Sequence, residues 1–206
     1  IFASASFRRD ASSRFHPDHR WGSFWSLGGA WIISKENWFK SSWIDMLKVK
    51  ASIGSQGNDN INNFLYSDMY NIVNSNDKVG ISFSSKGNKD ITWETQTNFN
   101  AGIEFDIFKR LSGSIEYYRR TTTDMLMAYT TAPSIGYTGY YANLGDLYNS
   151  GLELDLQLNI LNRRNLSWDF NVNLSTIKNR ITKLDDEHKT SYYYTTDGKR
   201  IDGYSS

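Results

Sequence analysis

The sequence predicts an all-β protein of antiparallel strands, and three observations support this. Apolar and polar side chains alternate along the chain, the alternating stretches are long, and short connections between them alternate with long ones. The alternation is clearest in SGLELDLQLNI, residues 150–160, where leucine or isoleucine fills every even position from 152 onward. A strand puts such residues on one face, whereas a helix with its period of 3.6 would scatter them around its surface.

Composition excludes several classes of protein. The 206 residues carry a net charge of +1, so no polyanionic partner such as a nucleic acid is indicated. Cysteine is absent, which removes disulfide scaffolds, thiolate metal sites and cysteine nucleophiles. No apolar run approaches the ~18 residues that a membrane-spanning helix needs. The first nine residues already alternate like a strand, so we expect the chain to begin inside a structure, as a fragment or a processed product.

The strand pattern recurs along the whole chain. Seven segments follow it, in this order: Ile1–Arg9, Trp25–Ile33, Leu47–Gly54, Trp93–Ile107, Leu111–Tyr118, Leu144–Ile160 and Leu166–Leu174. A poorly patterned eighth candidate lies between Ser191 and Tyr204. We therefore expect about seven or eight strands, each with one apolar and one polar face.

Strand length separates two architectures that share this alternation. A soluble antiparallel sandwich is the more common source of alternating strands, but soluble strands cluster at ~5–6 residues. A membrane-spanning strand tilted by ~45° needs ~9–11 residues to cross the hydrocarbon. The alternation over Trp93–Ile107 and over the Leu144–Ile160 region exceeds both lengths. This favours a transmembrane β-barrel whose strands extend above the membrane.

The connections point the same way. Two are short, at residues 108–110 and 161–165, whereas those at the opposite strand ends, residues 10–21, 55–91 and 121–139, are long. Outer-membrane barrels have short periplasmic turns and long outer loops, with apolar faces outward and polar faces toward the lumen. The connection from Ser34 to Met46 is an exception, and we expect it to hold a small helix with Ser34 as its N-cap. The predicted fold is thus an antiparallel transmembrane β-barrel segment.

Several motifs resemble one family. The segments ASFRRDASSRFHPDHRWGSFWSLGGAWIISKENWF and LKVKASIGSQGNDNI are similar to the barrel of SusC/RagA-like TonB-dependent outer-membrane transporters. WETQTNFNAGIEFDIFKRLSGSIEYYRRTTTDML and NLGDLYNSGLELDLQ resemble later strands of the same barrels, in the expected order. Ala11 stands where the family usually has glycine, and Ile53 where it usually has tyrosine. These departures affect a loop and the lipid face.

The resemblance implies a function for the parent protein. It implies a barrel of about 22 strands, of which residues 1–206 form one part, with the plug domain absent from this chain. Such a transporter in the outer membrane of a Gram-negative bacterium imports glycans, peptides or similar nutrients with energy from the TonB complex. The lipid bilayer, the plug, the remaining strands and a SusD-like surface lipoprotein are the implied partners. No cofactor is expected.

A search for catalytic and metal-binding motifs predicts that the chain is not an enzyme. His16 and His19 flank Asp18 in an outer loop, but they lack the surrounding residues that a metal site needs. Ser175 and Lys178 match Ser-x-x-Lys, yet that chemistry requires both on one helix face. We therefore expect neither a catalytic nor a metal site.

Two sets of residues remain as candidates for function. Glu94, Glu104, Glu153 and Asp155 are expected to face the barrel lumen. Trp21, Tyr137, Tyr140 and Tyr141 lie in or beside outer loops, where their rings either stack on a substrate or pack the loops together. The alternative function is a soluble or cell-surface β-sandwich that binds carbohydrate.

Overall fold

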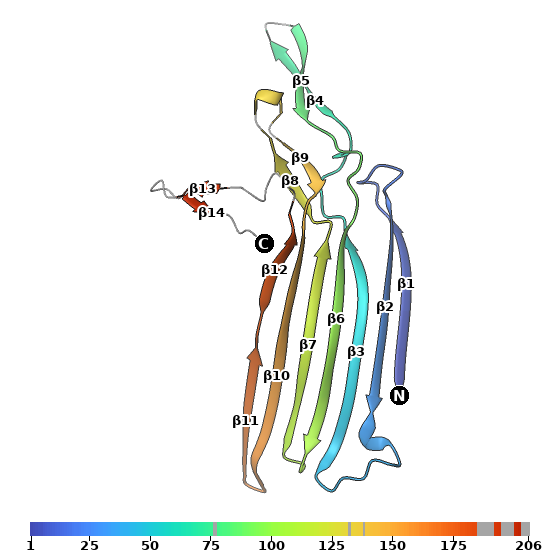
Figure 1. Ribbon diagram of the computed structural model, residues 1–206, viewed down its shortest axis with the longest axis vertical. Helices are drawn as coiled ribbons and strands as arrows, with labels where there is room; N and C mark the ends of the chain where they lie inside the picture. The colour runs from blue at the N-terminus through green and yellow to red at the C-terminus, as the bar shows by residue number, and fades with distance from the viewer. Residues whose placement is uncertain (76–77, 132, 138, 185–191, 195–199, 203–206) are drawn as a thin grey trace.

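The computed structural model describes residues 1–75, 78–131, 133–137, 139–184, 192–194 and 200–202. Its main feature is one antiparallel sheet of long strands that run side by side (Figure 1). These strands are β1 (Phe2–Ala11), β2 (Trp21–Ile32), β3 (Ile44–Asn58), β6 (Glu94–Ile107), β7 (Leu111–Thr123), β10 (Asp146–Arg163) and β11 (Leu166–Ser175). The all-β prediction is confirmed.

The sheet is a meander whose spatial order follows the chain, from β1 at one edge to β11 at the other. An eighth strand, β12 (Lys178–Lys183), continues β11 along β10. The pairs Glu153–Ser175 and Ser150–Lys178 keep the same register on either side of the junction, so β11 and β12 act as one long strand.

Two small hairpins stand beyond one end of the long strands (Figure 1). The first, β4 (Met69–Ser75) with β5 (Lys78–Ser85), connects β3 to β6, and the second, β8 (Leu126–Thr130) with β9 (Gly139–Asn143), connects β7 to β10. Short turns join β6 to β7 and β10 to β11 at the other end of the sheet. The predicted asymmetry of the connections is therefore present, and the long connections are partly folded rather than plain loops.

Side chains divide cleanly between the two faces of the sheet. Paired residues in neighbouring strands share a face, and one such row joins Ile103, Ile115, Leu154 and Leu174. We call this the apolar face. The alternate positions carry amides, hydroxyls and charges, among them Lys50, Asn100, Glu116 and Glu153, and form the polar face.

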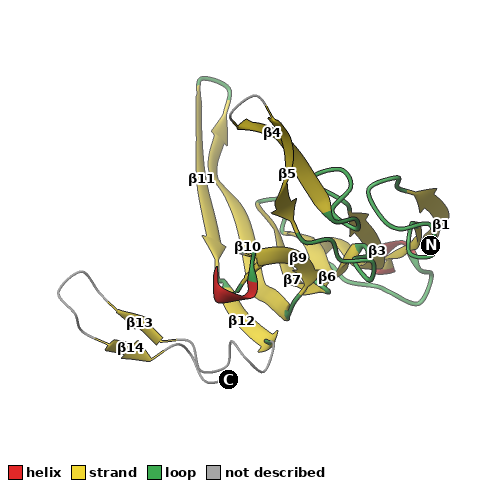
Figure 2. Ribbon diagram, turned by 90° about the horizontal axis from the view of Figure 1, so that it is seen from above, coloured by secondary structure: helices red, strands yellow, loops and turns green. Residues whose placement is uncertain are grey.

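No second layer of strands covers the apolar face within the described residues, as the view from above shows (Figure 2). Leu152 is 52% exposed, Phe170 is 54% exposed and Leu174 is 60% exposed. A sandwich would bury these side chains between two sheets, since the inner faces of both supply its core. A membrane-spanning sheet instead turns them toward lipid.

The buried core lies among the outer loops rather than on the sheet. Phe15 and Ile91 are fully buried, and Ile61 and Leu65 complete the cluster. The Trp93 ring packs at 5.4 Å from Phe15 and at 5.3 Å from Phe24, measured between ring centroids. The loops on this side therefore form one packed cap over the strand ends.

Two glycines give the cap room. A Cβ atom at Gly57 would lie only 2.1 Å from the Phe24 ring, and one at Gly22 only 2.4 Å from it. Phe24 therefore lies against two backbone positions that cannot carry a side chain without displacing it. The Phe24 ring thereby packs on the backbone of β2 and β3 on one side and against Trp93 of the cap on the other.

Two sequence-based expectations were wrong in detail. The connection after β2 begins with a 3₁₀ turn, η1 (Ile33–Lys35), whose N-cap is Ile32 without a side-chain cap, so Ser34 does not cap a helix there. The aromatic residues after it pack locally instead, with the Trp38 ring centroid 6.2 Å from that of Trp31 and 6.0 Å from that of Phe39. The Trp31 Nε1 also donates to Glu36 Oε1 at 2.7 Å. The second helical turn, η2 (Pro133–Ile135), lies between β8 and β9.

The other correction concerns the eighth strand. It was expected between Ser191 and Tyr204, where the structure describes only two short paired strands, β13 (Tyr192–Tyr194) and β14 (Arg200–Asp202), apart from the main sheet. Residues 195–199 and 203–206 lie outside the described residues. The eighth strand of the sheet is β12, which the sequence reading had not separated from the connection after Leu174.

A charge on the apolar face tests the membrane reading. Leu156 lies in the middle of the apolar stretch of β10 and packs against Gly113, where an added Cβ would sit 2.7 Å from its Cδ2. We expect Leu156→Arg in the full-length protein to destabilise the fold in lipid vesicles, with a decrease in the free energy of unfolding of about 2–4 kcal/mol, the cost of an arginine near a bilayer midplane. Denaturant titration of the vesicle-inserted protein measures this loss.

Gln157→Arg is the matched control, because Gln157 lies next in the chain on the polar face. Its expected effect is below about 1 kcal/mol, the size of ordinary surface changes. Equal penalties at the two positions, or folding of the wild type in buffer without lipid, would contradict a lipid-facing apolar surface.

Candidate functional site

The polar face carries a chain of ion pairs across three strands. Lys48 Nζ lies 2.9 Å from Glu104 Oε2, and Lys50 Nζ lies 3.1 Å from Glu104 Oε1 and 2.7 Å from Glu116 Oε2. The lysines come from β3, Glu104 from β6 and Glu116 from β7. We call these four residues the ion-pair ladder.

A glycine in the middle strand makes the ladder possible. Gly102 of β6 pairs with Lys50 on one side and with Glu116 on the other. A Cβ atom at Gly102 would lie 3.2 Å from the Glu116 Cβ and 2.8 Å from the Ile115 carbonyl oxygen. Because no side chain intervenes, the Lys50 ammonium reaches two strands across to Glu116.

The ladder fixes charge on the face more than it stabilises the fold. Its side chains are 26–35% exposed, so water screens each pair and a contribution of about 0–1 kcal/mol per pair is typical. Its main effect is to hold acids and bases in alternation along the face. Such a surface attracts neither strongly cationic nor strongly anionic solutes.

Beside the ladder is a polar hollow of about 430 Å³ on β6, β7 and β10. Its lining comprises Asn98, Asn100, Glu116, Tyr118, Arg119, Arg120, Asn149, Glu153 and Ile177. The Tyr118 ring covers Gly151, where an added Cβ would lie 2.8 Å from the Tyr118 hydroxyl oxygen. Arg120 Nε donates a hydrogen bond to Asn98 Oδ1 at 3.0 Å, so two of the lining side chains fix each other's position.

The four predicted carboxylates share the polar face but do not form one site. Glu104 belongs to the ladder, and Glu153 lies opposite Glu116 at the hollow without an ion pair to any described side chain. Asp155 lies opposite Asn173, whose amide, turned with its nitrogen toward the acid, donates to it at 3.0 and 3.2 Å.

Glu94 has a different environment at the cap end of β6. It accepts hydrogen bonds from Asn58 Nδ2 at 3.0 Å and from the backbone N–H of Leu126 at 3.1 Å. Glu94 thereby joins the end of β3 to the start of the β8–β9 hairpin. This carboxylate positions an outer hairpin.

Aromatic rings form a continuous row across the two outer hairpins. The centroid distances are 5.4 Å for Tyr70–Phe83, 6.2 Å for Phe83–Tyr137, 6.4 Å for Tyr137–Tyr140 and 5.1 Å for Tyr140–Tyr129. We call these five residues the aromatic row. The sequence had singled out Tyr137 and Tyr140 but not their three partners. Each ring pair adds about 0.5–1.5 kcal/mol beyond its buried area.

The other two aromatic candidates lie elsewhere. Trp21 is 57% exposed at the start of β2, with the Arg9 guanidinium carbon 5.0 Å from its ring centroid. Tyr141 packs against the buried cluster of the cap, and its carbonyl oxygen accepts a hydrogen bond from Asn88 at 3.0 Å. Their contacts are those of rim and packing residues.

The base of the β4–β5 hairpin is clamped by one acid. Asp68 Oδ1 accepts hydrogen bonds from the Gly87 backbone N–H at 2.8 Å and from Lys86 Nζ at 3.0 Å. The Gly87 bond first, and then Lys86, hold the pKa of Asp68 below its usual value. This clamp fixes the strand ends that carry Tyr70 and Phe83.

These surfaces combine a polar sheet face, which carries the ion-pair ladder, with the aromatic row on the two hairpins at its end. Among the described residues, no group of three or more histidine, aspartate or glutamate side chains is arranged to hold a metal ion. His16 Nδ1 lies 3.2 Å from Asp18 Oδ2 and its ring packs edge-on against Tyr66, so this motif is engaged in local contacts. No helix in the described part of the chain is long and apolar enough to cross a membrane.

The ladder was missed because its pairing depends on register. Lys48 and Lys50 alternate with apolar residues in the sequence, as do Glu104 and Glu116. Their parity alone assigns all four to the polar face. Nothing local says which lysine lies opposite which acid, so the signal becomes specific only once the strands are paired.

Comparison with known proteins identifies the family. Residues 2–205 match the family model described as TonB dependent receptor-like, beta-barrel. The chain is 34% identical over 208 residues to TonB-dependent receptor P39 of Formosa agariphila, and 31% identical over 199 residues to TonB-dependent receptor SusC of Bacteroides thetaiotaomicron. These alignments cover 96% and 91% of this chain.

Solved structures agree with these relatives. The structure of the RagAB peptide transporter superposes with a TM-score of 0.84 and 31% identity over 97% of this chain and 22% of that chain. The chain spans 20% of the length of the P39 and SusC relatives. The family match over residues 2–205 shows that the chain belongs to the TonB-dependent receptor β-barrel family.

Proposed function

We propose that this chain is a stretch of the wall of an outer-membrane transporter that actively imports nutrients. The apolar face meets lipid and the polar face, with Glu94, Glu104, Glu153 and Asp155, lines the lumen. The observation that carries this is the broad, uncovered apolar face opposite a polar face, in a chain of this family. Water in the lumen solvates the ladder and the hollow, while hydrocarbon accepts the leucines.

The outer cap is proposed to face the cell exterior and to meet the substrate first. Tyr137 and Tyr140 lie in the aromatic row, where flat rings present faces to sugars or to the side chains of peptides. RagAB is described as a peptide importer, and peptides or glycans are the substrate classes we propose here. Trp21 and Tyr141, which already contact Arg9 and the cap core, are proposed to support the mouth from its edge and its base.

A surface lipoprotein of the SusD type is the proposed partner above the cap. Ile72 and Ile81 pair on one face of the β4–β5 hairpin and are 80% and 76% exposed, with Val79 beside them at 76%. The hairpin that carries them stands beyond the end of the long strands (Figure 1). A contiguous exposed apolar group of this kind is typical of a protein-binding surface. The plug, the remaining strands and the TonB complex are the other proposed partners.

The experiment that tests import uses bacterial cells that lack the full-length gene, with and without a plasmid copy. Fluorescently labelled oligopeptide and oligosaccharide mixtures serve as probes. We expect accumulation of one mixture to require the gene and to stop when a protonophore removes the energy supply. Equal accumulation with and without the gene, for both mixtures, would contradict the proposal.

Orientation is tested by cysteines at the two ends of the sheet. This chain has no native cysteine, so Ser134→Cys, between β8 and β9, and Asn165→Cys, in the turn after β10, are chemically distinct probes. In intact cells we expect an impermeant maleimide to label position 134 and not position 165, and to label both after lysis. Labelling of position 165 alone in intact cells would invert the topology.

The ladder provides a test of the wet lumen. Glu104→Gln removes one acid that faces two lysines, and we expect the free energy of unfolding to fall by less than about 1 kcal/mol because water screens the pairs. The control Glu153→Gln, on the same face without an ion pair, should have no measurable effect. Denaturant titration in vesicles compares them, and a loss of more than about 3 kcal/mol at Glu104 would indicate a dry, buried pair instead.

The aromatic row provides a test of substrate contact. We expect Tyr137→Ala to raise the probe concentration needed for half-maximal uptake by about 2- to 12-fold, the loss of one ring contact. Tyr137→Phe keeps the ring and should retain the wild-type value. Unchanged uptake in Tyr137→Ala would assign this ring to loop packing alone.

A further inference from the structure

Near the cap, the charged residues at regularly paired positions of the apolar face are cations. At the paired positions of this face that keep a regular register, the charged side chains near the cap end are Arg9, Arg119, Lys178 and Arg180. Two charged residues of β10 lie at or beyond its register shifts, Arg163 beside the turn and Asp146 at the cap end. No acid occupies a regularly paired position of this face among the described strands. The polar face, by contrast, mixes both signs.

The side chains of Arg119 and Arg9 extend toward the cap end of the sheet, away from its middle. Arg119 pairs with Ser150, yet its guanidinium carbon lies 4.4 Å from the ring centroid of Tyr148, one row nearer the cap. Arg9 does the same with Trp21, which lies one row nearer the cap than its own partner Ser23. Long cationic side chains that leave hydrocarbon for a polar interface bend in this way.

Three cations flank Ser150 and Tyr148 of β10 on this face. Ser150 of β10 pairs with Arg119 of β7 on one side and with Lys178 of β12 on the other, and Tyr148 pairs with Arg180. Arg119 lies on β7, and Lys178 and Arg180 lie on β12, so the two strands flank β10 and their backbones are about 9.6 Å apart, two strand spacings of ~4.8 Å. All three are exposed, and none forms an ion pair with a described acid. We call Arg119, Lys178 and Arg180 the basic cluster.

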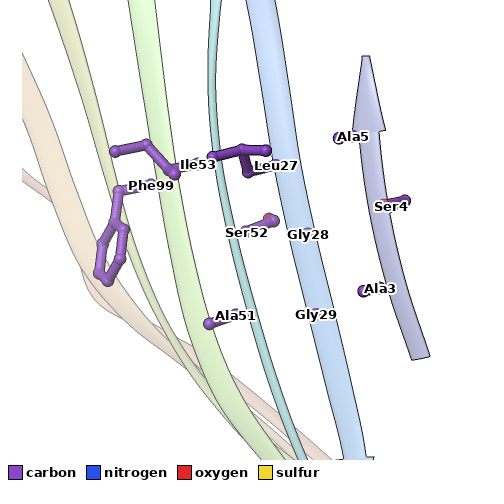
Figure 3. Close-up of a pocket in the computed structure, with 10 residues that line it drawn as sticks. All are labelled: Ala3, Ser4, Ala5, Leu27, Gly28, Gly29, Ala51, Ser52, Ile53 and Phe99. Atoms are coloured by element: carbon purple, nitrogen blue, oxygen red, sulfur yellow. The ribbon is translucent and has the colours of Figure 1, made fainter. Parts of the chain in front are cut away.

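An apolar hollow adjoins the basic cluster on the same face. Phe99 pairs directly with Arg119 and forms one edge of a hollow of about 490 Å³ (Figure 3). Its floor is made by small side chains and bare backbone at Ala3, Gly29 and Ala51, in the row of paired residues next to that of Leu27 and Ile53 (Figure 3). A hollow of this lining accepts hydrocarbon and offers nothing to a polar solute.

The cluster lies at the expected depth of lipid headgroups. A strand that rises ~3.3 Å per residue and is tilted by ~45° climbs about 2.3 Å per residue along the membrane normal. The Ser150 row is therefore about 5 Å, and the Tyr148 row about 9 Å, beyond Leu152, the leucine of β10 on the apolar face that lies nearest the cap. Phosphate groups of the outer leaflet begin where the apolar band ends.

We propose that the basic cluster binds the phosphate of an anionic lipid of the outer leaflet, whose acyl chains pack on the hollow beside Phe99. Arg119 supplies a planar fork of donors to the phosphate oxygens, and Tyr148 holds it in place through the cation–π contact. Lys178 and Arg180 add positive charge from β12, on the other side of β10. This inference rests on the proposed membrane orientation, because it needs the apolar face to meet lipid.

The test uses the full-length protein in detergent micelles and native mass spectrometry with three added lipids. These are lipid A, its enzymatically dephosphorylated form and zwitterionic phosphatidylcholine. We expect lipid A to be retained in preference to both others. Arg119→Gln should weaken its retention about 5-fold, as one cation near a lipid surface contributes ~1 kcal/mol, and the triple change Arg119→Gln, Lys178→Gln and Arg180→Gln should abolish the preference.

Arg120→Gln is the matched control, since Arg120 is the next residue and lies on the opposite face beside Asn98. It should retain lipid A like the wild type. A heat-modifiable band on a gel checks that each variant is folded, which separates loss of the barrel from loss of the lipid site. Equal retention of the three lipids by a folded wild type, an equal loss in Arg120→Gln, or displacement of lipid A by millimolar inorganic phosphate would overturn the proposal.

Discussion

The structure depends on one constraint: a backbone in hydrocarbon has no water to satisfy its N–H and C=O groups. Long strands paired edge to edge satisfy these groups within the sheet. Their side chains point alternately to its two faces, one apolar and one polar. The row Ile103, Ile115, Leu154 and Leu174 lies on the first, and Lys50, Glu116 and Glu153 lie on the second. Every other feature of the chain is arranged around that division.

The division explains where the core is. Within the described residues no second layer covers the sheet, so fully buried side chains such as Phe15 and Ile91 collect in the connections at its hairpin end. There, Phe24 on two glycines and Glu94 on the β8–β9 hairpin tie the loops to the strand ends. The aromatic row then has a rigid base, which a binding mouth needs and plain loops would not supply.

Sequence alone predicted the faces well because side chains alternate with a period of two along a strand, and the register shifts lie near strand ends, as between Asn159 and Leu161 of β10. It predicted strand ends poorly: β3, for example, runs to Asn58, beyond the last alternating apolar residue, because Gly57 and Asn58 still pair with Thr95 and Glu94 of β6. The hairpin of Ile72 and Ile81 has only a few alternating residues, so it was read as connection. The ladder and the basic cluster needed the register between strands, which is set by many weak pairings at once.

The most direct test of the lipid–water division is a spin-label scan along residues 152–158 of the full-length protein in vesicles. Each position is changed to cysteine in turn and labelled, and its collisions with oxygen, which dissolves in lipid, and with a nickel chelate, which stays in water, are measured. The account predicts oxygen maxima at the even positions and nickel maxima at the odd ones, out of phase along the whole stretch. Even positions shielded from both reagents would place the leucines in a protein core and contradict it.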